Sequence, residues 1–204
     1  MNESSSFSGG PKARASRGST RNGPGNDKPR QRTYRLPTEE RLTRSAIHYL
    51  DRYASSVSNL RSVLKRKVSR AARSHDKDPE EFSELIELVV AKCERSGMVN
   101  DTDYAATKVA SLRRRGRSQR QIEAQLKSKG VADETLYKAL DAHDSDDWNA
   151  AQTYARRRKL GPWRTRGPLA EFRQKDMAAL CRAGFSYDIA RKIMALEPDA
   201  EPYR

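Results

Sequence analysis

Apolar residues recur at helical spacing almost without interruption from residue 38 to residue 197. The series begins with positions that share one helical face, namely Leu42, Ala46, Tyr49, Leu50 and Tyr53. No segment alternates apolar and polar residues in the way that predicts a β-strand. This periodicity restricts the chain to an all-α fold.

Capping residues and glycines divide the helical region into short helices. Residues with side chains suited to helix N-caps are Thr38, Ser58, Asp101 and Ser118, the last forming a capping box with Gln121. Asp78 and Pro79 open a further helix, since proline is tolerated at a first helical position. Gly97, Gly130 and Gly184 are placed to end helices in the left-handed conformation.

The helices fall into three groups that echo one another. In each group the middle helix carries a buried leucine, at Leu64, Leu126 and Leu180, followed by a basic turn. We therefore predict three tandem three-helix repeats at residues 36–98, 99–143 and 144–197, flanked by a disordered basic tail at 1–35 and a short tail at 198–204. Units this small bury little apolar surface alone, so we expect them to stack into an elongated, curved, solenoid-like body.

The charge of the chain indicates an anionic partner. Among 204 residues, 41 Lys and Arg oppose 27 Asp and Glu, which gives a net charge of +14. A cationic protein gains affinity for polyanions because each neutralised phosphate releases counterions. The tail at 1–35 contributes to this charge, but such tails often do no more than keep a protein soluble.

The basic residues gather in three clusters. The binding candidates are Arg113, Arg114, Arg115, Arg117 and Arg120 in the second repeat, Arg156, Arg157, Arg158 and Lys159 in the third, Lys65, Arg66 and Lys67 in the first, and the aromatic residue Trp163. Cations near helix C-termini also serve the last carbonyls and the helix dipole. Adjacent cations repel one another, however, so recurrence of such runs at equivalent positions favours an anionic partner.

Aromatic and acidic residues admit two interpretations each. Trp148, Tyr104 and Tyr137 could stack on unpaired bases, yet each fits an apolar stripe, and core packing is favoured. Trp163 lies between basic residues, where a contact role and a loop-anchoring role are equally supported. Asp144, Asp146 and Asp147 resemble a metal cluster, but their position at a helix N-terminus is explained by the helix dipole.

Several function classes lack support in the sequence. It contains no glycine-rich phosphate loop, nucleophile elbow or zinc-protease helix, so we expect a protein that is not an enzyme and needs no cofactor. No apolar stretch is long enough to span a bilayer, which predicts no membrane partner and a cytoplasmic location. Cys93 and Cys181 are isolated, so neither a disulfide nor a metal site is expected.

Three sets of residues resemble the RecX family of recombination regulators. The run Tyr49-Leu50-Asp51-Arg52-Tyr53-Ala54-Ser55-Ser56, followed by Leu60 and Leu64-Lys65-Arg66-Lys67, is similar to the family's first repeat. Gly97-Met98-Val99-Asn100-Asp101 with Tyr104, and Ile122 with Leu126, Lys129 and Gly130, resemble its next signatures. The resemblance covers residues 38–197 and is weaker in the third repeat. Asn100 and Val68 stand where the family pattern has an acid and a glycine.

The resemblance implies a three-helix-repeat protein that binds RecA and its filament on single-stranded DNA, and thereby inhibits RecA ATPase, strand exchange and recombination. The basic clusters would then contact RecA or the DNA phosphate backbone, and we expect the protein to act as a monomer. An alternative remains open, namely a sequence-nonspecific DNA-binding protein of the nucleoid type that acts without RecA.

Overall fold

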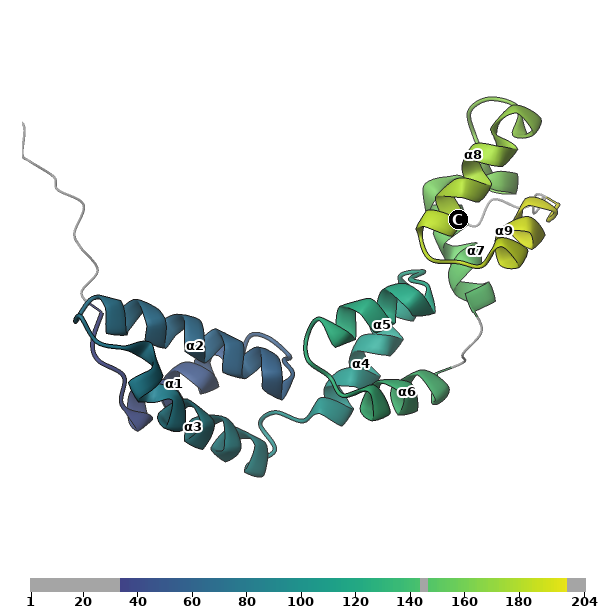
Figure 1. Ribbon diagram of the computed structural model, residues 1–204. Coiled ribbons are helices and arrows are strands. Elements are labelled where there is room, and N and C mark those ends of the chain that lie inside the picture. The colour runs from purple at the N-terminus through teal and green to yellow at the C-terminus, as the bar shows by residue number, and fades with distance from the viewer. Residues whose placement is uncertain (1–33, 144–146, 198–204) are drawn as a thin grey trace, which may run out of the picture. The chain divides into compact units, whose positions relative to one another are not determined.

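The protein is all-helical, as the sequence predicts. The computed structural model describes residues 34–143 and 147–197, and these ranges contain nine α-helices, two short 3-10 helices and no strand (Figure 1). The α-helices are α1 Glu39–Leu50, α2 Val57–Arg73, α3 Ser83–Arg95, α4 Asp101–Arg114, α5 Gln119–Lys127, α6 Asp133–Asp141, α7 Asp147–Arg158, α8 Leu169–Arg182 and α9 Tyr187–Met194. The 3-10 helices are η1 Pro79–Phe82 and η2 Gly161–Trp163. The predicted tails at 1–35 and 198–204 lie almost entirely outside the described residues.

Each group of three helices has its own apolar core. We call α1–α3 the first unit, α4–α6 the second unit and α7–α9 the third unit. Their buried clusters are centred on Leu60 and Leu64, on Ile122 and Leu126, and on Leu180. The second and third clusters each lie within one predicted repeat, whereas the first also includes Val99, which begins the second predicted repeat. The limits of the repeats as domains stay a prediction.

Side-chain caps define where most helices begin, and two of them differ from the prediction. Thr38 caps α1 as predicted, with its hydroxyl accepting from the backbone nitrogen of Arg41. The cap of α2 is Ser56 rather than Ser58, and the cap of α4 is Asn100 rather than Asp101. Both caps have the extended backbone that an N-cap requires. Helical periodicity places the apolar face well but leaves the first residue uncertain by one or two positions.

Two further details of the first unit differ from the prediction. Asp78 and Pro79 open the short helix η1, with a capping box between Asp78 and Glu81, and α3 follows from Ser83. Tyr53 is not on the buried stripe, because α1 ends at Leu50 and the side chain of Tyr53 is 57 % exposed. Its ring instead lies against that of Tyr49, with 5.2 Å between the centroids.

The units are connected by the same pair of hydrogen bonds at two places. At the first joint, which we define by Ser56, Asp101 and Lys129, the Ser56 hydroxyl donates to the Lys129 carbonyl and the Val57 backbone nitrogen donates to Asp101 at 2.8 Å. At this joint the serine that caps the middle helix of the first unit therefore also binds a turn of the second unit.

The second joint, defined by Ser118, Asp147 and Ala183, repeats this arrangement. The Ser118 hydroxyl donates to the Ala183 carbonyl at 2.6 Å, and the Gln119 backbone nitrogen donates to Asp147 at 2.8 Å. In the third unit the residue before the middle helix is Pro168, which forms no side-chain cap. Because proline has no hydroxyl to donate, the third unit cannot offer the same bond to a further unit.

The backbones of the second and third units approach closely at Gly116. This residue has a φ of +72°, and a Cβ there would lie 2.8 Å from the backbone nitrogen of Tyr154 and 3.0 Å from the carbonyl oxygen of Ala150. Gly97, with a nearly equal φ of +71°, would place a Cβ with nothing within 4 Å. The two glycines have the same backbone requirement in different surroundings.

We predict that Gly116→Ala lowers the free energy of unfolding more than Gly97→Ala does. Both substitutions carry the cost of a left-handed alanine, about 1 kcal/mol. Gly116→Ala must in addition displace the backbone of α7, which should add about 1–3 kcal/mol. Urea denaturation followed by circular dichroism measures both losses, and equal losses would show that the second joint yields without cost.

Candidate nucleic-acid interface

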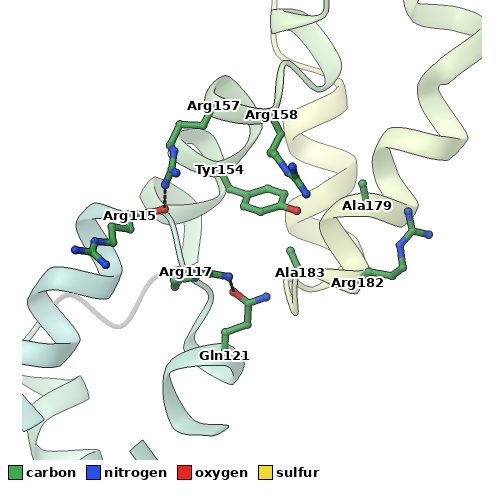
Figure 2. A pocket seen from close by; sticks show the side chains of 9 residues that line it. All are labelled: Arg115, Arg117, Gln121, Tyr154, Arg157, Arg158, Ala179, Arg182 and Ala183. Carbon is green, nitrogen blue, oxygen red and sulfur yellow. Dashed lines mark hydrogen bonds between the residues drawn. The ribbon is translucent and has the colours of Figure 1, made fainter. Parts of the chain in front are cut away.

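An open groove of about 690 Å³ lies between the second and third units (Figure 2). Arginine dominates its lining, which consists of Arg115, Arg117, Gln121, Tyr154, Arg157, Arg158, Ala179, Arg182 and Ala183. We call this surface the arginine groove. The end of α4 and the start of α5 supply one side, and α7 and the end of α8 supply the other.

The groove side chains are ordered by contacts with one another and with the backbone. The Arg157 guanidinium donates to the carbonyl of Arg115 at 2.7 Å, and Arg117 donates to the side-chain oxygen of Gln121 at 3.1 Å. The guanidinium of Arg158 lies 6.0 Å from the centroid of the Tyr154 ring. Figure 2 shows the Tyr154 side chain pointing into the space between Arg158 and Arg182.

The electrostatic character of the groove follows from its lining. Five of the nine lining residues are arginines and none is a carboxylate. Guanidinium groups stay protonated in proteins, so the residues around this one opening carry five positive charges. Like charges held this close repel one another, and an anion placed between them would relieve that repulsion.

The predicted candidates in the second and third units divide between the groove and other surroundings. Arg115, Arg117, Arg157 and Arg158 come together in it. Of the other candidates from these units, Arg114, Arg120 and Lys159 are exposed outside the lining, and the Arg156 guanidinium lies 5.1 Å from the centroid of the Trp163 ring, which packs against the third core.

Arg113 lies at the second joint rather than in the groove. Its guanidinium pairs with Asp147, and the two side chains are only 12 % and 15 % exposed. Asp147 also accepts from the Gln119 backbone nitrogen at 2.8 Å, so one carboxylate connects both sides of the joint. In this structure Arg113 therefore contributes to the position of the groove.

The candidates of the first unit lie on α2. Lys65, Arg66 and Lys67 are exposed, and the Lys67 ammonium donates to the hydroxyl of Ser45 on α1. None of the three lines the arginine groove. They form a separate basic surface of the first unit.

Arg182 lines the groove but is not among the candidates predicted from the sequence. It follows the buried Leu180 at the end of α8, and its side chain is exposed. The repeated pattern of a buried leucine followed by a basic turn included this position. A lone arginine is a weaker signal in a sequence than the runs at 113–115 and 156–158, and only the fold brings Arg182 close to the arginines that follow α4 and lie on α7.

The aromatic predictions are partly confirmed. Tyr104 is 8 % exposed and belongs to the core of the second unit, and Trp148 packs against the third core. Tyr137 is not a core residue, because it is 42 % exposed and the Lys127 ammonium lies 5.6 Å from its ring centroid. Its neighbour Leu136 occupies the buried position of α6 instead.

A metal site in a protein takes most of its ligands from His, Cys, Asp and Glu side chains. Within the described residues, no group of three or more such side chains is placed to hold a metal ion. Asp144 and Asp146 of the predicted acidic cluster lie outside these residues, and Asp147 is engaged at the second joint. Cys93 is buried, which raises the pKa of its thiol, whereas Cys181 is exposed. No described helix is long and apolar enough to cross a membrane.

Comparison with known proteins matches most of the chain. The family model for the RecX second three-helix domain matches residues 100–140. The regulatory protein RecX of Myxococcus xanthus (strain DK1622) is 42 % identical over 180 residues, which cover 85 % of this chain and 96 % of that protein. The chain belongs to the RecX family of regulatory proteins.

Other RecX proteins agree with this assignment. The regulatory protein RecX of Agrobacterium fabrum (strain C58 / ATCC 33970) is 33 % identical over 163 residues, covering 78 % of this chain and 86 % of that protein. The crystal structure of RecX from Lactobacillus salivarius has a TM-score of 0.56 at 23 % identity and covers 76 % of this chain and 94 % of that chain. It supports the fold.

Membership of the RecX family confirms the resemblance seen in the sequence. The family is one of regulatory proteins and is not a known enzyme family. Arg115 and Arg117 lie within the matched second three-helix domain, whereas Arg157, Arg158 and Arg182 lie beyond it. The arginine groove therefore combines residues from inside and outside the part matched by the family model.

We predict that Arg113→Ala and Arg114→Ala, neighbouring substitutions in the last turn of α4, have different effects on stability. Arg113→Ala removes a mostly buried ion pair and should lower the free energy of unfolding by about 2 kcal/mol. Arg114 is exposed, so Arg114→Ala should change it by less than about 0.5 kcal/mol. Chemical denaturation of the two variants tests this difference, and similar losses would contradict the structural role of Arg113.

Proposed function

We propose that this RecX-family chain binds RecA and its filament on single-stranded DNA, and inhibits RecA ATPase, strand exchange and recombination. The observation that carries the proposal is family membership along most of the chain, with 42 % identity to a regulatory protein RecX over 180 residues. The protein would act as a monomer in the cytoplasm.

The charge of the described surface supports a partner that contains DNA. A RecA filament on single-stranded DNA presents phosphates together with protein surface. The arginine groove, with five guanidinium groups and no carboxylate in its lining, suits such a polyanionic assembly. The exposed residues Lys65, Arg66 and Lys67 offer a second cationic surface on the first unit.

The proposed mechanism is steric and electrostatic. A chain of packed three-helix units can lie along an extended partner and oppose the movements of filament subunits that accompany ATP hydrolysis. Cationic side chains would hold it there through charge-assisted hydrogen bonds to phosphate or acidic side chains. No covalent chemistry is required.

We predict that the protein inhibits the RecA ATPase on single-stranded DNA at concentrations well below that of RecA. The measurement is the rate of ATP hydrolysis during a titration at two salt concentrations. Inhibition should persist at the higher salt, because a contact with shape complementarity between proteins is screened less than phosphate binding alone.

The same titration separates this function from the alternative. A nucleoid-type protein that only coats DNA would slow RecA when it saturates the strand, and the effect would disappear as salt rises. That pattern would contradict the proposed regulation of RecA.

A further inference from the structure

We infer that the arginine groove is a two-sided clamp for the phosphodiester backbone of single-stranded DNA, and that the second joint sets its width. The inference deepens the proposed function and rests on it, because it names the component of the filament that this groove contacts. It treats the groove as a site formed by two units together.

Phosphate is the ligand that this lining suits best. A guanidinium presents donors in a planar fork that matches the oxygens of a phosphate group. Arg117, Arg158 and Arg182 project such forks from both sides, and the hydroxyl of Tyr154 lies between them (Figure 2). No acidic side chain lines the groove to neutralise them.

A nucleic-acid strand fits this arrangement better than an acidic protein surface does. Successive nucleotides place one negative charge at every phosphate, so a short stretch can meet several guanidinium groups at once. Carboxylates on folded proteins are usually interspersed with cations and rarely match five arginines in so small an opening. We therefore infer a nucleic-acid strand as the ligand, and competition with an acidic polypeptide tests the acidic protein surface.

The two sides of the groove belong to different units. Arg115 and Arg117 follow the end of α4, while Arg157 and Arg158 lie on α7 and Arg182 lies on α8. The spacing between the sides consequently depends on how α4 and α5 meet α7 and α8. A strand bound by both sides would need that spacing to be constant.

The second joint supplies the constraint. The Ser118 hydroxyl is fully buried and donates to Ala183, the neighbour of Arg182 in the chain. Arg113 pairs with Asp147, and Arg157 on α7 donates to the carbonyl of Arg115. These contacts lie directly beside the groove, so a change at Ser118 should alter ligand binding without removing any guanidinium.

The first experiment removes one arginine from each side, in the double variant Arg117→Gln with Arg182→Gln. Both side chains are exposed, so the fold should be retained. The control is Arg52→Gln with Arg95→Gln, which removes the same charge from exposed positions of the first unit. Binding of a fluorescein-labelled 20-nucleotide oligothymidylate is measured by fluorescence anisotropy across a series of salt concentrations, without RecA.

The groove variant should bind the oligonucleotide at least about tenfold more weakly than the wild type at moderate salt. The slope of log K against log salt should fall in magnitude by about 1.4, since each lost phosphate contact on a single strand contributes about 0.7. The control should keep the wild-type slope. Equal losses in both variants would indicate diffuse attraction by net charge and would overturn the inference.

Competition distinguishes the possible sources of negative charge. Poly-L-glutamate or duplex DNA of matched charge should displace the labelled strand from the wild type less well than unlabelled oligothymidylate does. A contrary result would be that poly-L-glutamate competes as well as unlabelled oligothymidylate does, and that the groove variant binds both polymers equally weakly. In that case the groove recognises acidic side chains as readily as phosphates, and the assignment to DNA is wrong. Equal competition by the duplex would overturn the assignment to a single strand.

The second experiment tests the joint. Ser118→Ala removes a hydroxyl bond between units beside the groove, and Ser56→Ala removes the equivalent bond at the first joint. Ser118→Ala should weaken oligothymidylate binding about three- to tenfold, whereas Ser56→Ala should leave it unchanged. Circular dichroism verifies that both serine variants remain folded. If one of them does not fold, the arginine variants still test the groove.

The clamp and the regulation of RecA can fail independently of one another. If Ser118→Ala binds DNA like the wild type, or if Ser56→Ala has the same effect, the joint does not set the width of the groove. If the groove variant loses DNA binding but still inhibits RecA, the proposed regulation of RecA stands and does not need the clamp. If the wild type clamps DNA but never inhibits RecA, the proposed function fails while the clamp remains.

Discussion

The arginine groove lies beside a contact between two units that one buried serine hydroxyl makes. As the N-cap of α5, the Ser118 hydroxyl accepts a hydrogen bond from the backbone nitrogen of Gln121. The same hydroxyl is shielded from solvent and donates a hydrogen bond to the carbonyl of Ala183 in the next unit. A buried hydroxyl without partners would cost about 1–3 kcal/mol, so both bonds favour one relative placement of the units. The arginine groove opens beside this contact.

The same physical device occurs twice along the chain. Ser56 and Ser118 each cap a middle helix and bind the following unit, and Asp101 and Asp147 each accept the next backbone nitrogen from that helix. Helix capping and contact between units are thereby combined in the same few side chains. Each unit has a small apolar core of its own, and these polar contacts give the connection between cores a direction that apolar packing alone would not specify.

The charged side chains of this protein include mostly buried ion pairs and arginines that line an open groove. Arg113 and Asp147 form a mostly buried pair, and Arg164 pairs with the buried Asp176, which raises the pKa of Arg164. The arginines of the groove line an opening that has no carboxylate in its lining. A run of adjacent arginines in the sequence thus contains residues with different surroundings. Arg113 supports the joint and Arg115 lies at the groove, although only Arg114 separates them.

The sequence by itself determined the helical class, the three groups of helices and most of the buried positions, because an apolar face with a period of 3.6 residues is local information. It also placed Arg115, Arg117, Arg157 and Arg158 in basic runs. Only the tertiary structure decided which arginines share an opening. Arg182 lines the groove and Arg113 does not, because Ser118 binds Ala183 and Arg113 pairs with Asp147. These contacts connect residues 65 and 34 positions apart, and no local pattern encodes them.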